Sequence, residues 1–129
     1  MTPQTEFLEL LCKTIEDNVS LMHSISLKEL KAEGGIYAEL GEGFADSQYF
    51  DKSTILTMPV LFMCRDGDQK KGLEQLIKIC NYLQRRKEYP NGSSFGWIDA
   101  AIAKQPGKIG RDEDGVYHFS CIINCRIYF

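Results

Sequence analysis

The fold is decided by the stretch VYHFSCIINCRIYF, which runs from Val116 to Phe129. Every odd-numbered residue in it is apolar, whereas the even positions include His118, Ser120 and Arg126. Alternation with a period of two predicts an extended strand with one buried face. The stretch is longer than most strands, which have ~3–10 residues. Because a small domain does not cover so long a strand alone, the pattern favours a protein that assembles with other chains.

Length and composition limit the class of protein. The 129 residues predict one domain over residues 1–129, large enough to bury a hydrophobic core. The composition is 43% hydrophobic and 26% charged, which is typical of a soluble globular protein. A net charge of −3 argues against a general nucleic-acid-binding surface. We expect neither a membrane span nor a signal peptide, because no apolar run is long enough and the first residues have no basic segment.

The cysteines indicate a reducing environment. No pair has the Cys-x-x-Cys spacing, and each cysteine lies within an apolar pattern. We therefore expect buried, reduced thiols that pack as small apolar groups, as in cytoplasmic proteins. The five residues concerned are Cys12, Cys64, Cys80, Cys121 and Cys125.

Two amphipathic helices are predicted. Apolar residues recur every three to four positions over residues 4–21, directly after Pro3, which suits a helix start. The same period runs from Leu73 to Leu83, and Asp68 is the expected N-cap of that helix. Basic residues at 85–87 suit the end of the second helix because they favour the negative end of its dipole.

Four strands are predicted, over residues 36–40, 53–64, 95–103 and 116–129. Residues 24–33 fit either a capping box or a short strand, and both interpretations remain open. We expect a polar loop through Asp46 and Ser47, and an eleven-residue loop over residues 105–115. The predicted fold is α+β in the order α-β-β-α-β-β, with two helices on one face of a mainly antiparallel four-stranded sheet.

The strand over residues 53–64 is apolar on both faces, which predicts cover on both sides. Pro59 lacks a backbone N–H, so we expect it at a sheet edge or a bulge. An edge strand with two apolar faces is a candidate contact with another subunit. Edge pairing by this strand and the final one would supply the two different patches of a head-to-tail ring.

No catalytic, metal or cofactor site is predicted. The sequence has no phosphate-binding glycine loop and no Gly-x-Ser-x-Gly motif. The two histidines, His23 and His118, have no ligand-pair spacing with the cysteines, which argues against zinc. The acidic run at 112–114 lacks the alternating oxygen donors of a calcium loop.

Candidate interface residues come instead from the two long strands and from the loop before the last one. That loop offers both signs of charge for docking to a protein partner. The candidate subunit or partner contacts are Pro59, Leu61, Met63, Lys108, Ile109, Arg111, Asp112, Glu113, Asp114, His118, Arg126 and Tyr128.

Three blocks in a fixed order carry a family resemblance. They are MPVLFMCR at residues 58–65, ICNYL at 79–83 with Tyr89-Pro90 after it, and KIGRDEDG at 108–115, which leads into the final strand. Over roughly residues 25–129 the chain resembles the tail terminator proteins, often labelled minor capsid proteins, of tailed phages and prophages of Gram-positive bacteria. Similar proteins occur in phage tail-like bacteriocins.

The resemblance implies a structural virion protein and not an enzyme. It implies a ring, typically a hexamer, that stops tube polymerisation at the head-proximal end of the tail and provides the head-joining surface. The implied partners are the tail tube protein, a head-completion or neck protein, a sheath protein where one exists, and DNA only in transit. Assembly would take place in the host cytoplasm, and no cofactor is implied.

Two other classes remain open from the residues alone. One is a small ligand- or peptide-binding module that acts as a dimer. The other is a small α+β enzyme, such as an acyltransferase with a site at a β-bulge.

The acidic balance of the chain suits a ring whose channel passes DNA without binding it, because like charges repel.

Overall fold

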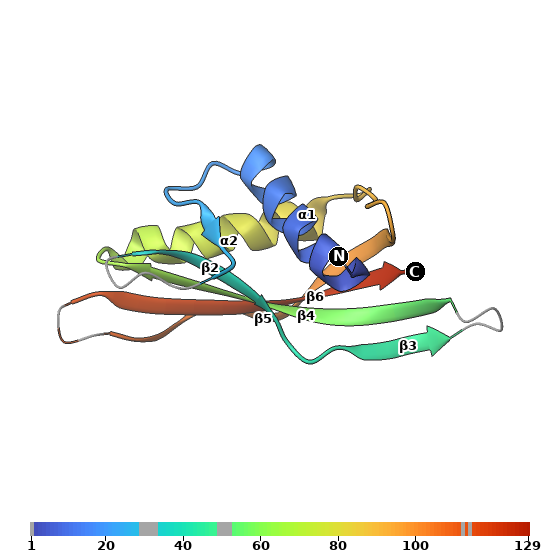
Figure 1. Cartoon of the computed structure of the whole chain (residues 1–129). Coiled ribbons are helices and arrows are strands. Elements are labelled where there is room, and N and C mark those ends of the chain that lie inside the picture. The colour runs from blue at the N-terminus through green and yellow to red at the C-terminus, as the bar shows by residue number, and fades with distance from the viewer. Residues whose placement is uncertain (1, 29–33, 49–52, 112, 114) are drawn as a thin grey trace.

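The computed structural model describes residues 2–28, 34–48, 53–111, 113 and 115–129. Two helices, α1 (Pro3–Asn18) and α2 (Gln69–Arg85), lie on the same face of a long, twisted sheet (Figure 1). The predicted α+β class and the one-sided helix layer are confirmed. Within the described residues, neither helix is long and apolar enough to cross a membrane.

Over the described residues the sheet has six strands, so the prediction of four is wrong. Its order is β1-β2-β4-β6-β5, and β3 also pairs with β4, on the same side as β2. Of the strand pairings in the described part of the chain, only the short β1–β2 contact is parallel. The strand bounds are β1 Ile25–Ser26, β2 Gly35–Leu40, β3 Phe44–Gln48, β4 Thr54–Asp66, β5 Gly96–Arg111 and β6 Tyr117–Tyr128. Without the two-residue β1, the order is α-β-β-β-α-β-β.

Capping residues fix where the helices begin and end. The Asp68 carboxylate accepts a hydrogen bond from the backbone N–H of Lys71 at 3.1 Å, which confirms the predicted N-cap of α2. The first helix begins at Pro3, as expected, but it ends at Asn18 and not at residue 21. The Asn18 side chain donates to the carbonyl of Thr14, and Val19 is already extended.

The core lies between the helix layer and the sheet. Apolar residues of α1 and α2 meet the alternate residues of β4 and β6 that point toward the helices. Phe7 of α1 makes edge-to-face contacts with Trp97 at 5.1 Å and Phe95 at 5.7 Å between ring centroids. All five cysteines are free and buried, as predicted.

The two longest predicted strands lie inside the sheet, so the prediction that they form its edges is wrong. Twelve consecutive residue pairs join β4 to β6, from Ile55–Tyr128 to Asp66–Tyr117. On its other side β4 pairs with β2 and β3, and β6 pairs with β5. The edges of the sheet are therefore β5 on one side and the β1, β2 and β3 group on the other.

Pro59 lies in the interior strand β4, at the position where one neighbour replaces another. The β2 pairing ends at Val60, and the β3 pairing begins at Thr57. The Pro59 carbonyl accepts from the N–H of Gly41 at 2.7 Å, so this side of Pro59 faces the bend between β2 and β3. Backbone N and C=O of one strand residue point the same way, so the missing N–H falls where no regular ladder bond is required.

Two segments predicted as loops are strands. The polar residues around Asp46 and Ser47 belong to β3, which pairs with the first residues of β4 through a bulge. Residues 105–111 extend β5 along β6, and the register shifts several times between Trp97 and Gly110. Of the ambiguous region 24–33, residues 25 and 26 form β1, and residues 29–33 lie outside the described part of the chain.

Candidate functional site

The helices lie on one face of the sheet (Figure 1), and the centre of the opposite face of β4 carries apolar residues. Along β4, residues such as Val60 and Phe62 point toward the helices and have no exposed surface. Their neighbours Pro59, Leu61 and Met63 point the other way and are only half-buried. We call the surface opposite the helices, formed by β2, β4, β6 and β5, the open face. The expectation that both faces of this strand are covered therefore holds only on the helix side within one chain.

The register of β4 and β6 brings predicted interface residues together on the open face. Directly opposed pairs of an antiparallel ladder share a face of the sheet. Pro59 lies opposite Asn124, Leu61 opposite Ile122, and Met63 opposite Ser120. The six predicted residues that lie on this face are Pro59, Leu61, Met63, His118, Arg126 and Tyr128.

Polar side chains surround the apolar centre of the open face. The Arg126 guanidinium binds the Asp99 carboxylate through both oxygens, at 2.5–3.0 Å. Lys104 donates to the hydroxyl of the buried Ser120 at 3.0 Å. These contacts fix the side chains in place. Because the Asp99 and Arg126 side chains are 40% and 42% exposed, their ion pair adds at most about 1 kcal/mol of stability.

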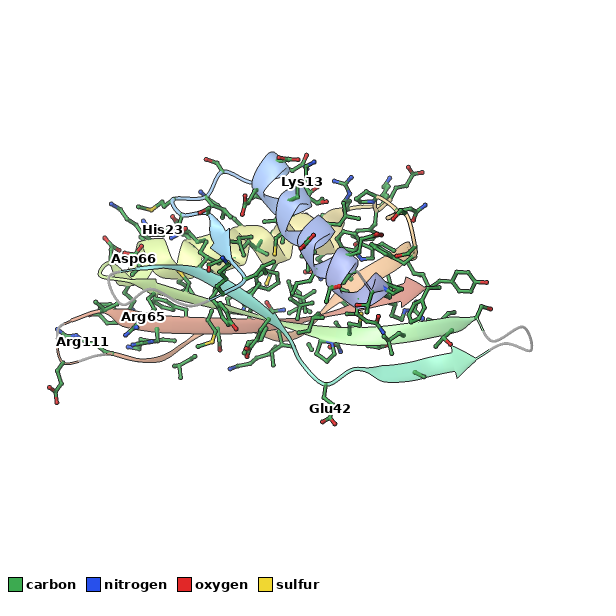
Figure 2. The ribbon with its side chains drawn as sticks, viewed as in Figure 1. Lys13, His23, Glu42, Arg65, Asp66 and Arg111 are labelled. Carbon is green, nitrogen blue, oxygen red and sulfur yellow. The ribbon has the colours of Figure 1, made fainter. Side chains whose placement is uncertain are left out.

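At the end of the open face opposite Arg126, the side chains of Arg65 on β4 and His118 on β6 lie next to each other. An Arg65 Nη2 to His118 Nε2 distance of 3.2 Å allows a hydrogen bond. Arg65 is placed at this end of the sheet, close to Asp66 at the end of β4 (Figure 2). The open face therefore consists of an apolar centre with charged and polar groups at both ends.

The other predicted residues lie on the β5–β6 hairpin, which extends past the start of α2 (Figure 1). Ile109 is 58% exposed at a register shift, and Lys108 and Arg111 both contact the Tyr117 ring, at 5.7 and 5.5 Å from its centroid. Glu113 is exposed in the turn. The predicted residues Asp112 and Asp114 lie outside the described part of the chain.

The sequence did not identify every residue of the open face. Ile122 completes the apolar centre, but the final strand was interpreted as polar on this side. Asp99 and Lys104 belong to this face because bulges in β5 change which residues point away from the helices. The even-numbered residues of the final strand were the available signal for the β6 part, whereas the bulges in β5 leave no periodic signal.

Burial raises the thiol pKa at three of the five cysteines, whereas a hydrogen bond with Cys121 lowers the pKa of Cys80. Burial raises the pKa of Cys12 and of Cys64 to about 12, so neither thiol ionises near neutral pH. Burial also raises the pKa of Cys125. Across the described ranges, no three His, Cys, Asp or Glu side chains come close enough together to hold a metal ion.

The comparison with known families agrees with the resemblance of the three sequence blocks. Residues 16–129 match the family described as bacteriophage tail terminator protein, which includes every strand, α2 and the end of α1. No individually curated protein matches the chain significantly. Since the family match spans most of the sequence, the chain belongs to the bacteriophage tail terminator protein family.

Proposed function

We propose that this chain forms a ring, with six copies the expected number, on the head-proximal end of a phage tail tube. The ring ends polymerisation of the tube and offers the surface to which the head is joined. The proposal rests on family membership, which implies association with the tail tube, and on one structural observation: the apolar side chains at the centre of the open face are only half-buried.

The open face has the composition of a protein contact surface. Contiguous apolar surface with a polar border is typical of protein–protein interfaces. Leu61, Met63 and Ile122 supply the apolar part, and the Asp99–Arg126 pair stands at its border. Burial of such side chains stabilises an assembly by roughly 25 cal/mol per Å² of apolar surface removed from water. We assign this face to contact with a neighbouring copy or with the tube.

A terminator that works by occupying a tube end needs no chemistry, so we propose that the protein is not an enzyme and requires no cofactor. Its partners would be the tail tube protein, a head-completion or neck protein and, in a contractile particle, the sheath. It would assemble in the host cytoplasm and remain at the neck of the virion. DNA would meet it only in transit through the ring.

The test is a complementation experiment with tail length as the measurement. A phage or prophage that lacks the gene is supplied with the wild-type protein, with Leu61→Lys, or with the control Ile77→Lys. Ile77 is an exposed aliphatic residue on α2, in the helix layer, so the control adds the same charge on the opposite side.

We expect tails of uniform length with the wild type and the control, and tails of uncontrolled length with Leu61→Lys and without the gene. Mass measurement of the purified wild type, alone and with tube ends, should give a ring. Tails of normal length without the gene would contradict the proposal. A stable dimer that ignores tube ends would favour the small binding module instead.

A further inference from the structure

We propose that neighbouring copies meet through the two opposite edges of the sheet, and that complementary charge selects this contact. The basic edge consists of Lys104, Lys108 and Arg111 on β5. The acidic edge consists of Glu39 on β2 and Glu42 just after it. The occupant of each edge is a second copy of this chain. The inference rests on the proposed ring and deepens it by assigning the surfaces that close it.

The topology places these charges on opposite sides of one chain. β5 ends the sheet on one side, while β2 and β3 end it on the other. Figure 2 shows Arg111 on the hairpin and Glu42 at the bend between β2 and β3, pointing away from the helices. Two different patches on one subunit are what a head-to-tail ring requires.

The charge distribution on the two edges is one-sided. β5 contains three basic residues and one acidic residue, Asp99, whose carboxylate is already paired with Arg126. Residues 34–43 contain two acidic residues and no basic one. All five charged residues are exposed, namely Lys104, Lys108, Arg111, Glu39 and Glu42. Contact between unlike edges joins opposite charges, whereas a two-fold dimer through either edge would join like charges. The pattern therefore favours a ring over a dimer.

Among the residues that the structure describes, four of these side chains contact neutral groups, namely those of Lys104, Lys108, Arg111 and Glu39. Lys104 donates to Ser120, and Lys108 lies near the Gln69 amide oxygen and the Tyr117 ring. The Glu39 carboxylate accepts from the Tyr37 hydroxyl at 2.9 Å. These contacts hold the charged groups at the edges without neutralising them, so their charge is available to a neighbouring copy.

The contact would use side chains and not a continuous backbone ladder. Pro106 and repeated register shifts interrupt β5, and proteins use such irregularities together with lysines to prevent uncontrolled pairing of edge strands. Ile109, which is 58% exposed among the basic residues, provides the apolar part of the contact. An edge that resists strand addition but carries charge accepts only a partner with the complementary edge.

The experiment exchanges the charges of the two edges. Lys108→Glu with Arg111→Glu makes both edges acidic, and Glu39→Lys with Glu42→Lys makes both basic. A third protein carries all four substitutions and so has its edges swapped. The acidic turn at 112–114 stays unchanged throughout. The control, Lys13→Glu with Lys78→Glu, lowers the net charge by as much as the all-acidic variant does, but at exposed helix positions. Circular dichroism and thermal unfolding verify that each variant folds.

Each protein is measured by native mass spectrometry and by rescue of tail length in the gene-deleted phage. We expect the all-acidic and all-basic variants each to lose ring formation by about tenfold or more, because every contact joins like charges. The swapped protein and the control should form rings like the wild type. A mixture of the all-acidic and all-basic variants should also form rings, with the two chains alternating.

The mixture also reports the number of copies. Strict alternation closes only in a ring with an even number of subunits, so equal numbers of the two variants, three of each in a hexamer, are expected. Raising the salt to 1 M should weaken the wild-type ring, because exposed charges are then screened.

The outcomes separate the inference from the function on which it rests. If the wild type rescues tail length and folded all-acidic and all-basic variants do so equally well, the edge contact is wrong and the terminator function stands. The edge contact is also wrong if both variants fail but neither the mixture nor the swapped protein recovers. If the wild type itself gives neither rings nor rescue, the proposed function fails and the inference fails with it.

Discussion

Replacing Gly72 by alanine sets two effects of comparable size against each other in α2. Alanine is the better helix former by about 0.8–1.0 kcal/mol. However, a Cβ at this position would lie 2.5 Å from Cε2 and 2.9 Å from Cδ2 of the Phe119 ring, and 3.0 Å from the Asp66 Cβ. Ordinary carbon–carbon contacts are about 3.5–4.0 Å, so the ring would have to move by roughly 1 Å.

Phe119 has no room to make that movement, because its side chain is 1% exposed within the core. Forcing extra volume into a packed core costs roughly 1–3 kcal/mol, which exceeds the gain in helix propensity. We therefore expect Gly72→Ala to lower the free energy of unfolding by about 1 kcal/mol. For a chain of this size the corresponding fall in Tm is roughly 3–5 °C.

The assay is urea unfolding at a fixed subunit concentration, followed by the fluorescence of the single tryptophan, Trp97, which is buried in the core. Lys71→Ala, at an exposed position one residue earlier, is the control for helix propensity alone. In the Phe119→Leu background the penalty of Gly72→Ala should shrink, because the smaller side chain vacates the contact. If Gly72→Ala proves as stable as the wild type or more so, the close packing of α2 on β6 is wrong.

Single contacts supply three further predictions. Asp68→Ala removes the N-cap of α2 and should cost about 1 kcal/mol in urea unfolding; an unchanged midpoint would contradict the cap. The pKa of Glu6 is lowered from its usual 4.5, chiefly by the hydrogen bond from Ser93. The ionised carboxylate therefore stabilises the fold above pH 4.5, and this stabilisation is lost as the pH falls through the lower pKa of the folded state. Glu6→Gln should remove this part of the acid sensitivity of the Tm, and identical pH profiles would refute it. Native protein at pH 8 should react with a thiol reagent much more slowly than unfolded protein, because Cys12 and Cys64 are buried with pKa values of about 12; equal rates would exclude this burial.

The parts of the fold that sequence reasoning predicted are those with a strong period. The helices follow from their 3.6-residue pattern, and Asp68 identifies where the second one begins. The final strand follows from its two-residue alternation, which also placed His118, Arg126 and Tyr128 on the face away from the helices. These signals are local, since each side chain reports only which side of its own element is buried.

The position of a strand within the sheet was predicted wrongly where it depends on which strands lie beside it. Alternation shows which face of a strand is buried, but it does not show which strands lie beside it. Pro59 suggested an edge, whereas the missing N–H falls at the junction between two neighbouring strands. The polar residues Asp46, Ser47 and Gln48 hid β3, because a short strand paired on one side needs little apolar surface.

The strand predicted over residues 95–103 ended too early, because β5 continues to Arg111. Glycine, proline and lysine over residues 104–110 are typical of a loop, yet the segment pairs with β6 through a series of bulges. Composition that looks like a loop is also the composition of a protected edge strand. Gln105, Pro106 and Gly107 therefore mark the outer limit of the sheet and not the end of the strand.

Because β4 and β6 lie inside the sheet and β5, β2 and β3 form its edges, the surfaces available for assembly differ from those expected from the sequence. The most apolar strands, β4 and β6, have their backbone groups paired within the chain and contribute only side chains, on the open face. The backbone edges belong to β5 and to the β2–β3 side, which are irregular and carry opposite charge. A ring built from such subunits would gain its stability from apolar burial and its direction from charge. An interface that lost its charges should still associate, but without a preference for head-to-tail order, and would then be as free to stop at a dimer as to close a ring.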